Sequence, residues 1–138
     1  MMASVSSFSS VMPDATLLSL SEAFERCRAE TAEWAKTFYL GTLLMPLEKR
    51  QAIWAIYVWC RRTDEIMDSP EALSKPKEQL LAELDAWEHH TRAMFEGRVD
   101  TWLDKVMVDT IHRFSQPLQP YLDMIDGMRM DLTSLRYE

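Results

Sequence analysis

The sequence predicts an all-α protein. Of its 138 residues, 47% are hydrophobic and only 3 are glycine, a composition typical of a folded and helix-rich chain. No stretch alternates apolar and polar residues for long enough to indicate a strand, whereas apolar residues recur at helical spacing in five segments. The length allows one helical domain with a modest core.

The first predicted helix begins near Ser19, because Ser19 and Glu22 have the spacing of a capping box. We expect its buried stripe to contain Phe24, Cys27, Thr31, Trp34 and Phe38. Residues 37–45 are interpreted as a break between helices because they include Gly41.

Three helices are expected after the second one. The third runs from about Pro76 to Phe95, the fourth starts near Asp100, and the fifth follows Pro117. Their apolar residues are expected to form the core: Leu80, Leu81, Leu84, Trp87, Met94, Trp102, Val106, Met107, Ile111, Leu118, Leu122, Ile125, Met128 and Leu132.

The second helix, expected over residues 46–69, is unusual. Residues 52–60 are apolar on every side of the helix, which predicts that protein surrounds it. The helix then leads into Asp64 and Asp68, which lie about 40° apart on a helical wheel and close to the direction of Tyr57. We therefore expect two neighbouring carboxylates to face a shared cavity and not bulk solvent.

Two interpretations of this Asp64–Asp68 pair remain open. It could be a solvated acidic helix end next to Arg61 and Arg62. The apolar run before it favours a second interpretation, because two buried carboxylates cost several kcal/mol unless a cation compensates them. Carboxylate oxygens suit a hard cation such as Mg²⁺, with Mn²⁺ as the alternative.

Other site patterns are missing from the sequence. His89, His90 and His112 do not have the spacing of zinc ligands and are interpreted as surface residues. There is no glycine-rich phosphate loop. A metal held by carboxylates is therefore the expected way to bind a diphosphate.

Composition excludes several classes of function. The net charge of −7 argues against nucleic-acid binding. Cys27 and Cys60 lie in apolar contexts and are interpreted as core thiols in a reducing compartment. The longest uncharged run in the body of the chain, residues 51–60, is too short to span a membrane. Residues 1–20 are expected to be a disordered tail or a leader, and neither is favoured.

Three stretches carry a resemblance to a known family. Residues 35–45, residues 52–65, and residues 127–132 with Arg136 and Tyr137 resemble stretches of phytoene synthases of the cyanobacterial and plastid type. These enzymes belong to the squalene/phytoene synthase family. The resemblance extends from about Phe24 to Tyr137, and the matching strings are long and specific.

The resemblance implies a fold and an activity. The fold would be the N-terminal part of an isoprenoid-synthase helical bundle with a central cavity, with residues 21–138 forming an incomplete domain. The activity would be the head-to-head condensation of two geranylgeranyl diphosphates, through a cyclopropyl intermediate, to phytoene in carotenoid biosynthesis. The family's second aspartate-rich motif has no counterpart here, so this chain alone is expected to be inactive.

The resemblance also implies roles for particular residues. Asp64 and Asp68 would be catalytic and would bind Mg²⁺. The residues expected to bind or line the substrate site are Lys36, Thr37, Tyr57, Arg61 and Asp131. The motif here has Ile66, Met67 and Ser69 where the family more often has leucine, valine and glycine, and both carboxylates are kept.

The resemblance sets expectations for partners and location as well. We expect peripheral association with a membrane and contact with other carotenoid enzymes. The location would be the plastid in a eukaryote, and the cytoplasm or a membrane surface in a cyanobacterium. Three other functions remain open: an inactive short form that binds a full-length synthase, a squalene-synthase-like enzyme, and a helical bundle without a ligand.

Overall fold

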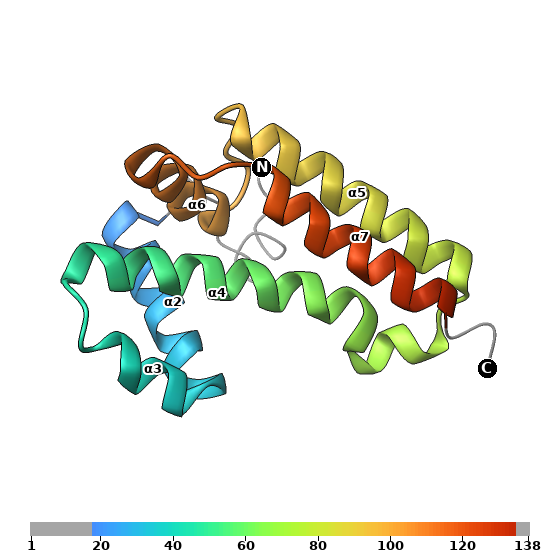
Figure 1. Cartoon of the computed structure of the whole chain (residues 1–138), viewed down its shortest axis with the longest axis horizontal. Coiled ribbons are helices and arrows are strands. Elements are labelled where there is room, and N and C mark those ends of the chain that lie inside the picture. Colours follow the sequence, from blue (N-terminus) through green and yellow to red (C-terminus); the bar gives the residue numbers. More distant parts are fainter. Residues whose placement is uncertain (1–17, 135–138) are drawn as a thin grey trace, which may run out of the picture.

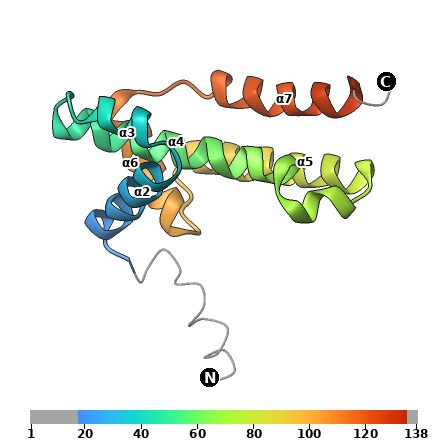
Figure 2. The ribbon, with the colours of Figure 1, turned by 90° about the horizontal axis from the view of Figure 1, so that it is seen from below.

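The computed structural model describes residues 18–134 and the side chains of residues 18–133. The described part is helical and contains no strand, which confirms the all-α prediction. Its elements are α2 (Leu20–Trp34), α3 (Lys36–Thr42), α4 (Leu47–Asp68), the short 3-10 helix η1 (Pro70–Ser74), α5 (Lys77–Phe95), α6 (Trp102–Phe114) and α7 (Gln119–Ser134). Helix α4 runs along the length of the molecule (Figure 1), and α2 and α7 lie on opposite sides of it (Figure 2).

Helix α2 begins as the sequence predicts. The Glu22 amide donates to the Ser19 hydroxyl at 3.0 Å, and the Ser19 amide donates to the Glu22 carboxylate at 2.8 Å. The buried residues of the helix are Ala23, Phe24, Cys27 and Thr31. The predicted stripe is wrong beyond Thr31, because Trp34 and Phe38 are 57% and 48% exposed. The helix ends at Trp34, and the extended φ of Ala35, −144°, turns the following residues away from the stripe.

The predicted break at residues 37–45 is also wrong, because Lys36–Thr42 form helix α3. The chain leaves helical geometry at Ala35 and again between Thr42 and Pro46. Gly41 lies inside the helix, at a cost of about 1 kcal/mol relative to alanine. A buried hydrogen bond helps to hold α3 to the core, since the Trp54 indole N–H donates to the Thr42 hydroxyl at 2.9 Å.

Helix α4 has the predicted bounds within two residues, but its surroundings differ from the prediction. Trp54, Ala55, Val58 and Trp59 are buried. The apolar residues on the remaining faces, which are Ile53, Ile56, Tyr57 and Cys60, are only half-buried. The described part of the chain therefore covers one side of α4 and leaves the other side partly open.

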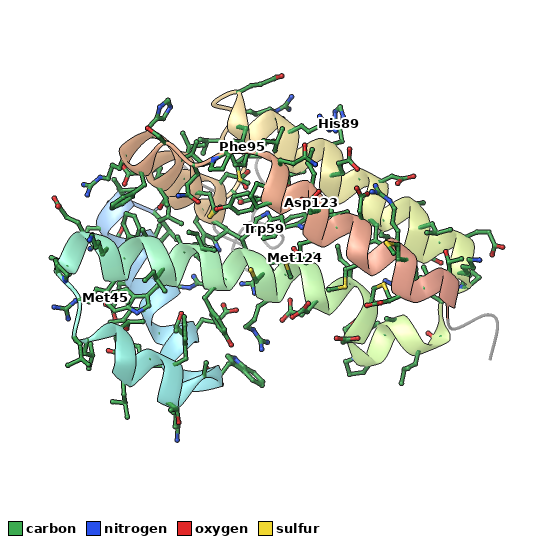
Figure 3. All side chains as sticks on the ribbon, viewed as in Figure 1. Met45, Trp59, His89, Phe95, Asp123 and Met124 are labelled. Atoms are coloured by element: carbon green, nitrogen blue, oxygen red, sulfur yellow. The ribbon has the colours of Figure 1, made fainter. Side chains whose placement is uncertain are left out.

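Trp59 is the central core residue. Its ring makes an edge contact with Tyr121 of α7, at 4.9 Å between centroids, and stacks on Trp87 of α5 at 5.9 Å. Its indole N–H donates to the Thr91 hydroxyl of α5 at 3.3 Å. Figure 3 shows Trp59 and Met124 in the space between α4 and α7. One side chain thus joins three helices.

Thr63 adds a polar contact one turn after Trp59. Its hydroxyl donates to the Trp59 carbonyl at 3.0 Å and accepts from the Trp87 indole N–H at 2.8 Å. Thr63 is fully buried. The hydroxyl therefore satisfies a donor that would otherwise have no partner inside the core.

The remaining elements follow the sequence prediction closely. Helices α5, α6 and α7 lie within two residues of the expected starts. Helix α6 ends at Phe114, and the residue that follows, Ser115, has a left-handed φ of 49°. The element η1 was not predicted. Its Ala72 packs on Leu80 and Leu132, so it connects the end of α4 to α5 and α7.

The cysteines are free thiols, as predicted for core residues. Burial raises the pKa of Cys27 to about 12 and that of Cys60 to about 11, so both stay protonated at neutral pH. Among the described residues, no helix is long and apolar enough to cross a membrane.

His90 is not the surface residue that the sequence suggests, although His89 and His112 are exposed. The ring of His90 stacks on Trp87, and its Nε2 lies 2.8 Å from Oδ1 of the buried Asp104. Oδ2 of Asp104 accepts the amides of Asp100 and Thr101 at 2.9 and 3.1 Å. The pair joins the end of α5 to the start of α6.

Replacing Thr63 with valine tests the buried hydroxyl. The side chain keeps its shape but leaves the Trp87 indole N–H without a partner, so the free energy of unfolding should fall by about 1–3 kcal/mol. Urea denaturation measures the change. Thr133→Val is the matched control, because the Thr133 hydroxyl is exposed and bonds only to the carbonyl of Arg129 in its own helix. Equal effects of the two substitutions would contradict the assignment.

The His90–Asp104 pair should make stability depend on pH. The hydrogen bond to Asp104 raises the pKa of His90 above 6.5. Burial by itself would raise the pKa of Asp104, but the His90 hydrogen bond and the backbone amides outweigh it and lower that pKa below 3.8. The pair therefore gives its full stabilisation between pH 3.8 and pH 6.5, the ordinary pKa values of the two groups. This stabilisation is lost as the pH rises through the raised pKa of His90 or falls through the lowered pKa of Asp104.

Calorimetry across this pH range provides the measurement. The Tm of the wild type should drop as the pH rises above 6.5. A His90→Asn variant should lack this part of the drop and keep the rest of the profile. Parallel profiles for the two proteins above this pH would show that the pair does not contribute.

Candidate functional site

A cleft of about 820 Å³ opens at the C-terminal end of α4. The residues lining it are Trp34, Arg61, Asp64, Glu65, Asp68, Ser69, Pro70 and Glu71. They come from the end of α2, the last two turns of α4 and the start of η1. Pro70 ends α4 and turns the chain into η1, so the carboxylates of α4 lie at a helix end and not along a packed surface.

Asp64 and Asp68 both line this cleft. The expectation of a shared cavity therefore holds, but the expectation that both carboxylates avoid bulk solvent is wrong for Asp68, because Asp64 is half-buried and Asp68, in the last turn of α4, is exposed. Burial raises the pKa of the Asp64 carboxyl, the charge of Asp68 raises it further, and Arg61 offsets only part of the effect. Negative charge is therefore crowded at this point of the cleft, and an added cation would relieve the repulsion.

Arg61 is the one basic side chain among the cleft residues. Its Nη2 donates to Glu65 at 2.9 Å, and its Nε donates to Glu30 at 3.1 Å. Its guanidinium carbon lies 4.1 Å from the centroid of the Trp34 ring. The side chain is thus held by two carboxylates and by a cation–π contact with an indole.

Sequence reasoning missed Glu30 and Trp34. Glu30 lies 31 residues before Arg61 and on a different helix, so no spacing rule connects the two. The sequence does contain one indication of an acidic partner, because two adjacent arginines, Arg61 and Arg62, directly follow an apolar run. Two adjacent cations at the edge of a core need an acidic partner from another element.

The remaining predicted site residues do not line the cleft. Tyr57 is half-buried and packs against Phe38, with ring centroids 5.7 Å apart. Lys36 and Thr37 are exposed at the start of α3, which is separated from Trp34 by Ala35 alone. Asp131 is exposed on α7.

Cys60 lies on α4 one turn before Asp64, but it lines a separate apolar pocket of about 240 Å³. The other residues of that pocket are Ile56, Trp59, Gln116, Pro120, Tyr121 and Met124. Asp64 and Asp68 therefore line one pocket of α4, and Cys60 lines another.

A second group of potential metal ligands consists of His90, Asp100 and Asp104, whose ligand atoms all lie within 4.8 Å of one another. Hydrogen bonds within the fold account for this arrangement. Both oxygens of Asp104 already accept hydrogen bonds from His90 and from two backbone amides. The Asp100 carboxylate pairs with Arg98 at 3.0 Å.

Residues 31–138 match the family model described as squalene/phytoene synthase. This chain therefore belongs to the squalene/phytoene synthase family. It is 55% identical over 125 residues to the 15-cis-phytoene synthase of Synechococcus elongatus, which covers 91% of this chain and 39% of that protein. It is 50% identical over 123 residues to the chloroplastic phytoene synthase of Cucumis melo, which covers 89% of this chain and 28% of that protein.

The fold comparison agrees with the family. The crystal structure of a squalene synthase from Alicyclobacillus acidocaldarius matches with a TM-score of 0.70 and 28% sequence identity. The match covers 81% of this chain and 40% of that one. The expectation of an isoprenoid-synthase helical fold is confirmed. The chain spans less than two fifths of the length of these curated relatives.

The crowding of charge in the cleft predicts a stabilising substitution. Asp64→Asn removes a carboxylate that Asp68 and Glu65 repel, so the Tm in metal-free buffer should rise above that of the wild type. Asp123→Asn is the control, since Asp123 is an exposed residue of α7 that accepts from Gln119, and it should leave the Tm unchanged. A lower Tm for Asp64→Asn would contradict this prediction, because it would mean that the Asp64 carboxylate stabilises the fold.

Proposed function

We propose that this chain is the N-terminal part of a phytoene synthase, a prenyltransferase that joins two geranylgeranyl diphosphates head to head. Residues 21–138 would form the N-terminal portion of the synthase domain, and most of residues 1–20 lie outside the described structure. The observation that carries the proposal is the Asp64–Asp68 pair beside Arg61 in one cleft of a chain 55% identical to a named 15-cis-phytoene synthase.

The cleft fits a divalent cation. Its carboxylates outnumber its one arginine, and they supply oxygen ligands only, a set that suits Mg²⁺, with Mn²⁺ as the alternative. Asp64 and Asp68 would hold the ion. A bound Mg²⁺ would act as a Lewis acid that stabilises the negative charge of a departing diphosphate.

Arg61 would contribute fixed positive charge to the same step. Its Nε and Nη2 bond to Glu30 and Glu65, and the remaining guanidinium N–H groups can donate to phosphate oxygens. Lys36, at the start of α3, would supply a second positive charge near the cleft, with Thr37 beside it. These groups would stabilise the leaving group as the allylic carbon–oxygen bond breaks.

The carbocation left by this step needs a dry apolar wall. Phe38 and Tyr57, which pack on each other, would contribute to that wall at the partly open side of α4. Asp131 would approach the cavity from α7. Further helices of a complete synthase would supply the opposite wall.

Location and further partners are part of the proposal. The names of several relatives place those proteins in the chloroplast, which supports a plastid location if this chain is eukaryotic, or else the cytoplasm or a membrane surface of a cyanobacterium. Exposed apolar residues at the α3–α4 turn, such as Leu44 at 90% exposure, support peripheral contact with a membrane or with other carotenoid enzymes.

A second candidate is a squalene-synthase-like activity. The solved structure that matches is a squalene synthase, and the same charged groups would serve a shorter allylic diphosphate. The lower identity of that match, 28% against 55%, favours phytoene synthase.

A chimeric enzyme tests the proposal. Residues 18–138 replace the matching segment of the Synechococcus elongatus synthase, and the product formed from geranylgeranyl diphosphate and Mg²⁺ is identified by chromatography. We expect phytoene. We expect none from the 138-residue chain alone, because its carboxylates line only one side of the diphosphate. Squalene formed from farnesyl diphosphate, in an assay supplied with NADPH as the hydride donor, would support the second candidate.

Substitutions in the chimera test the metal site. Asp64→Asn or Asp68→Asn should lower kcat at least ~100-fold, the size expected when a charge-stabilising group is lost. The Tm should not fall. Asp123→Asn is again the control and should keep full activity. Full activity of both cleft variants at saturating Mg²⁺ would rule out the metal role.

A further inference from the structure

Arg61 is held from three directions in the cleft. Glu65, four residues later on α4, accepts from Nη2 at 2.9 Å. The Trp34 ring at the end of α2 lies under the guanidinium at 4.1 Å. Glu30, also on α2, accepts from Nε at 3.1 Å. Two of the three contacts therefore come from a different helix.

The contact with Glu30 differs from the contact with Glu65. The Glu30 side chain is only 17% exposed, against 42% for Glu65. Glu30 also accepts from both terminal nitrogens of Arg62, at 2.7 and 3.0 Å. A carboxylate that is largely covered and accepts three hydrogen bonds has little freedom to move, whereas Glu65, a more exposed partner on the same helix as Arg61, can shift when a ligand arrives.

The position of the hydrogen bond on Arg61 is also informative, because Glu30 accepts from Nε and not from a terminal nitrogen. Nε is the nitrogen nearest the backbone, so a bond there sets the direction of the guanidinium plane. Among the described residues, Nη1 of Arg61 has no hydrogen-bond partner. The contact with Glu30 thus orients the group and leaves its outer N–H groups available to an anion in the cleft.

We propose that Glu30 is a positioning residue: acting with Trp34, it fixes the Arg61 guanidinium in the orientation in which its outer N–H groups bind a diphosphate. This rests on the proposed function of the cleft. Arginine has many rotamers in water, and binding an anion would otherwise require ordering the side chain at the moment of binding. Glu30 and Trp34 impose that order before the ligand binds.

The first measurement needs no ligand. In ¹⁵N NMR of the wild-type chain, the Nε–H of Arg61 should give a protected resonance with the heteronuclear NOE of an ordered group. Glu30→Gln weakens the charge-assisted bond, so the resonance should lose that NOE. An Arg61 Nε–H that stays equally ordered in Glu30→Gln would overturn the proposal.

The second measurement is calorimetric titration of the chain with inorganic pyrophosphate in Mg²⁺ buffer. Glu30→Gln should weaken binding about tenfold, the size typical of losing a partner that orients a binding group. In an Arg61→Gln background the same substitution should have no further effect, because Glu30 acts through Arg61. Equal affinities of wild type and Glu30→Gln would overturn the proposal.

A matched control separates positioning from stability. Arg62→Gln removes the other partner of Glu30 and should lower the Tm, as Glu30→Gln does, but it should keep pyrophosphate affinity. Loss of affinity in both variants, in proportion to their loss of stability, would mean that Glu30 is only structural. If the wild-type chain binds no pyrophosphate while its Arg61 is ordered, the proposed function of the cleft fails, and the diphosphate role of Glu30 fails with it.

Discussion

The position of α4 depends on the contacts of Trp59 and Thr63 with α5 and α7. Trp59 packs on Trp87 and Tyr121, and the Thr63 hydroxyl accepts the Trp87 indole N–H. These contacts fix the rotation of α4 about its own axis. Successive residues of a helix are turned by about 100°, so the side chain of Asp64 must leave the helix in a different direction from Thr63. Burial of one face therefore directs the carboxylates of α4 to the cleft.

Charged residues in and beside the cleft form two groups. Glu30, Arg61, Arg62 and Glu65 form a network in which acids and bases balance. Asp64 and Asp68 stand outside this balance, and the pKa of Asp64 is raised first by burial and then by the charge of Asp68. The network supplies an oriented cation, and the two aspartates supply the uncompensated negative charge that suits a metal ion.

The sequence predicted features that depend on nearby residues. The capping box at Ser19, the helix end before Pro70 and the common cleft of Asp64 and Asp68 each involve residues at most four positions apart. Helix α3 was missed because its breaks at Ala35 and Leu43 carry no proline or glycine, while Gly41 lies inside the helix. Residues before and after Ala35 were consequently assigned one continuous stripe, although Trp34 and Phe38 lie outside the core.

Contacts between distant residues could not be predicted in this way. Glu30 meets Arg61 across 31 positions, and His90 meets Asp104 across 14. Such pairs depend on how two helices pack, and spacing along one helix holds no information about that. The resemblance to a family supplied roles for Asp64 and Arg61, but it could not supply partners such as Glu30.

The sparse burial of α3 has a consequence for its dynamics. Of its seven residues only Thr42 is buried, whereas α4 has six buried residues along one face. Segments with few buried contacts open locally at a lower free energy than the whole domain. The amides of α3 should therefore exchange with solvent before those of α4. Lys36 and Thr37 belong to this segment, so they can change position by local opening while Trp59 keeps α4 in place.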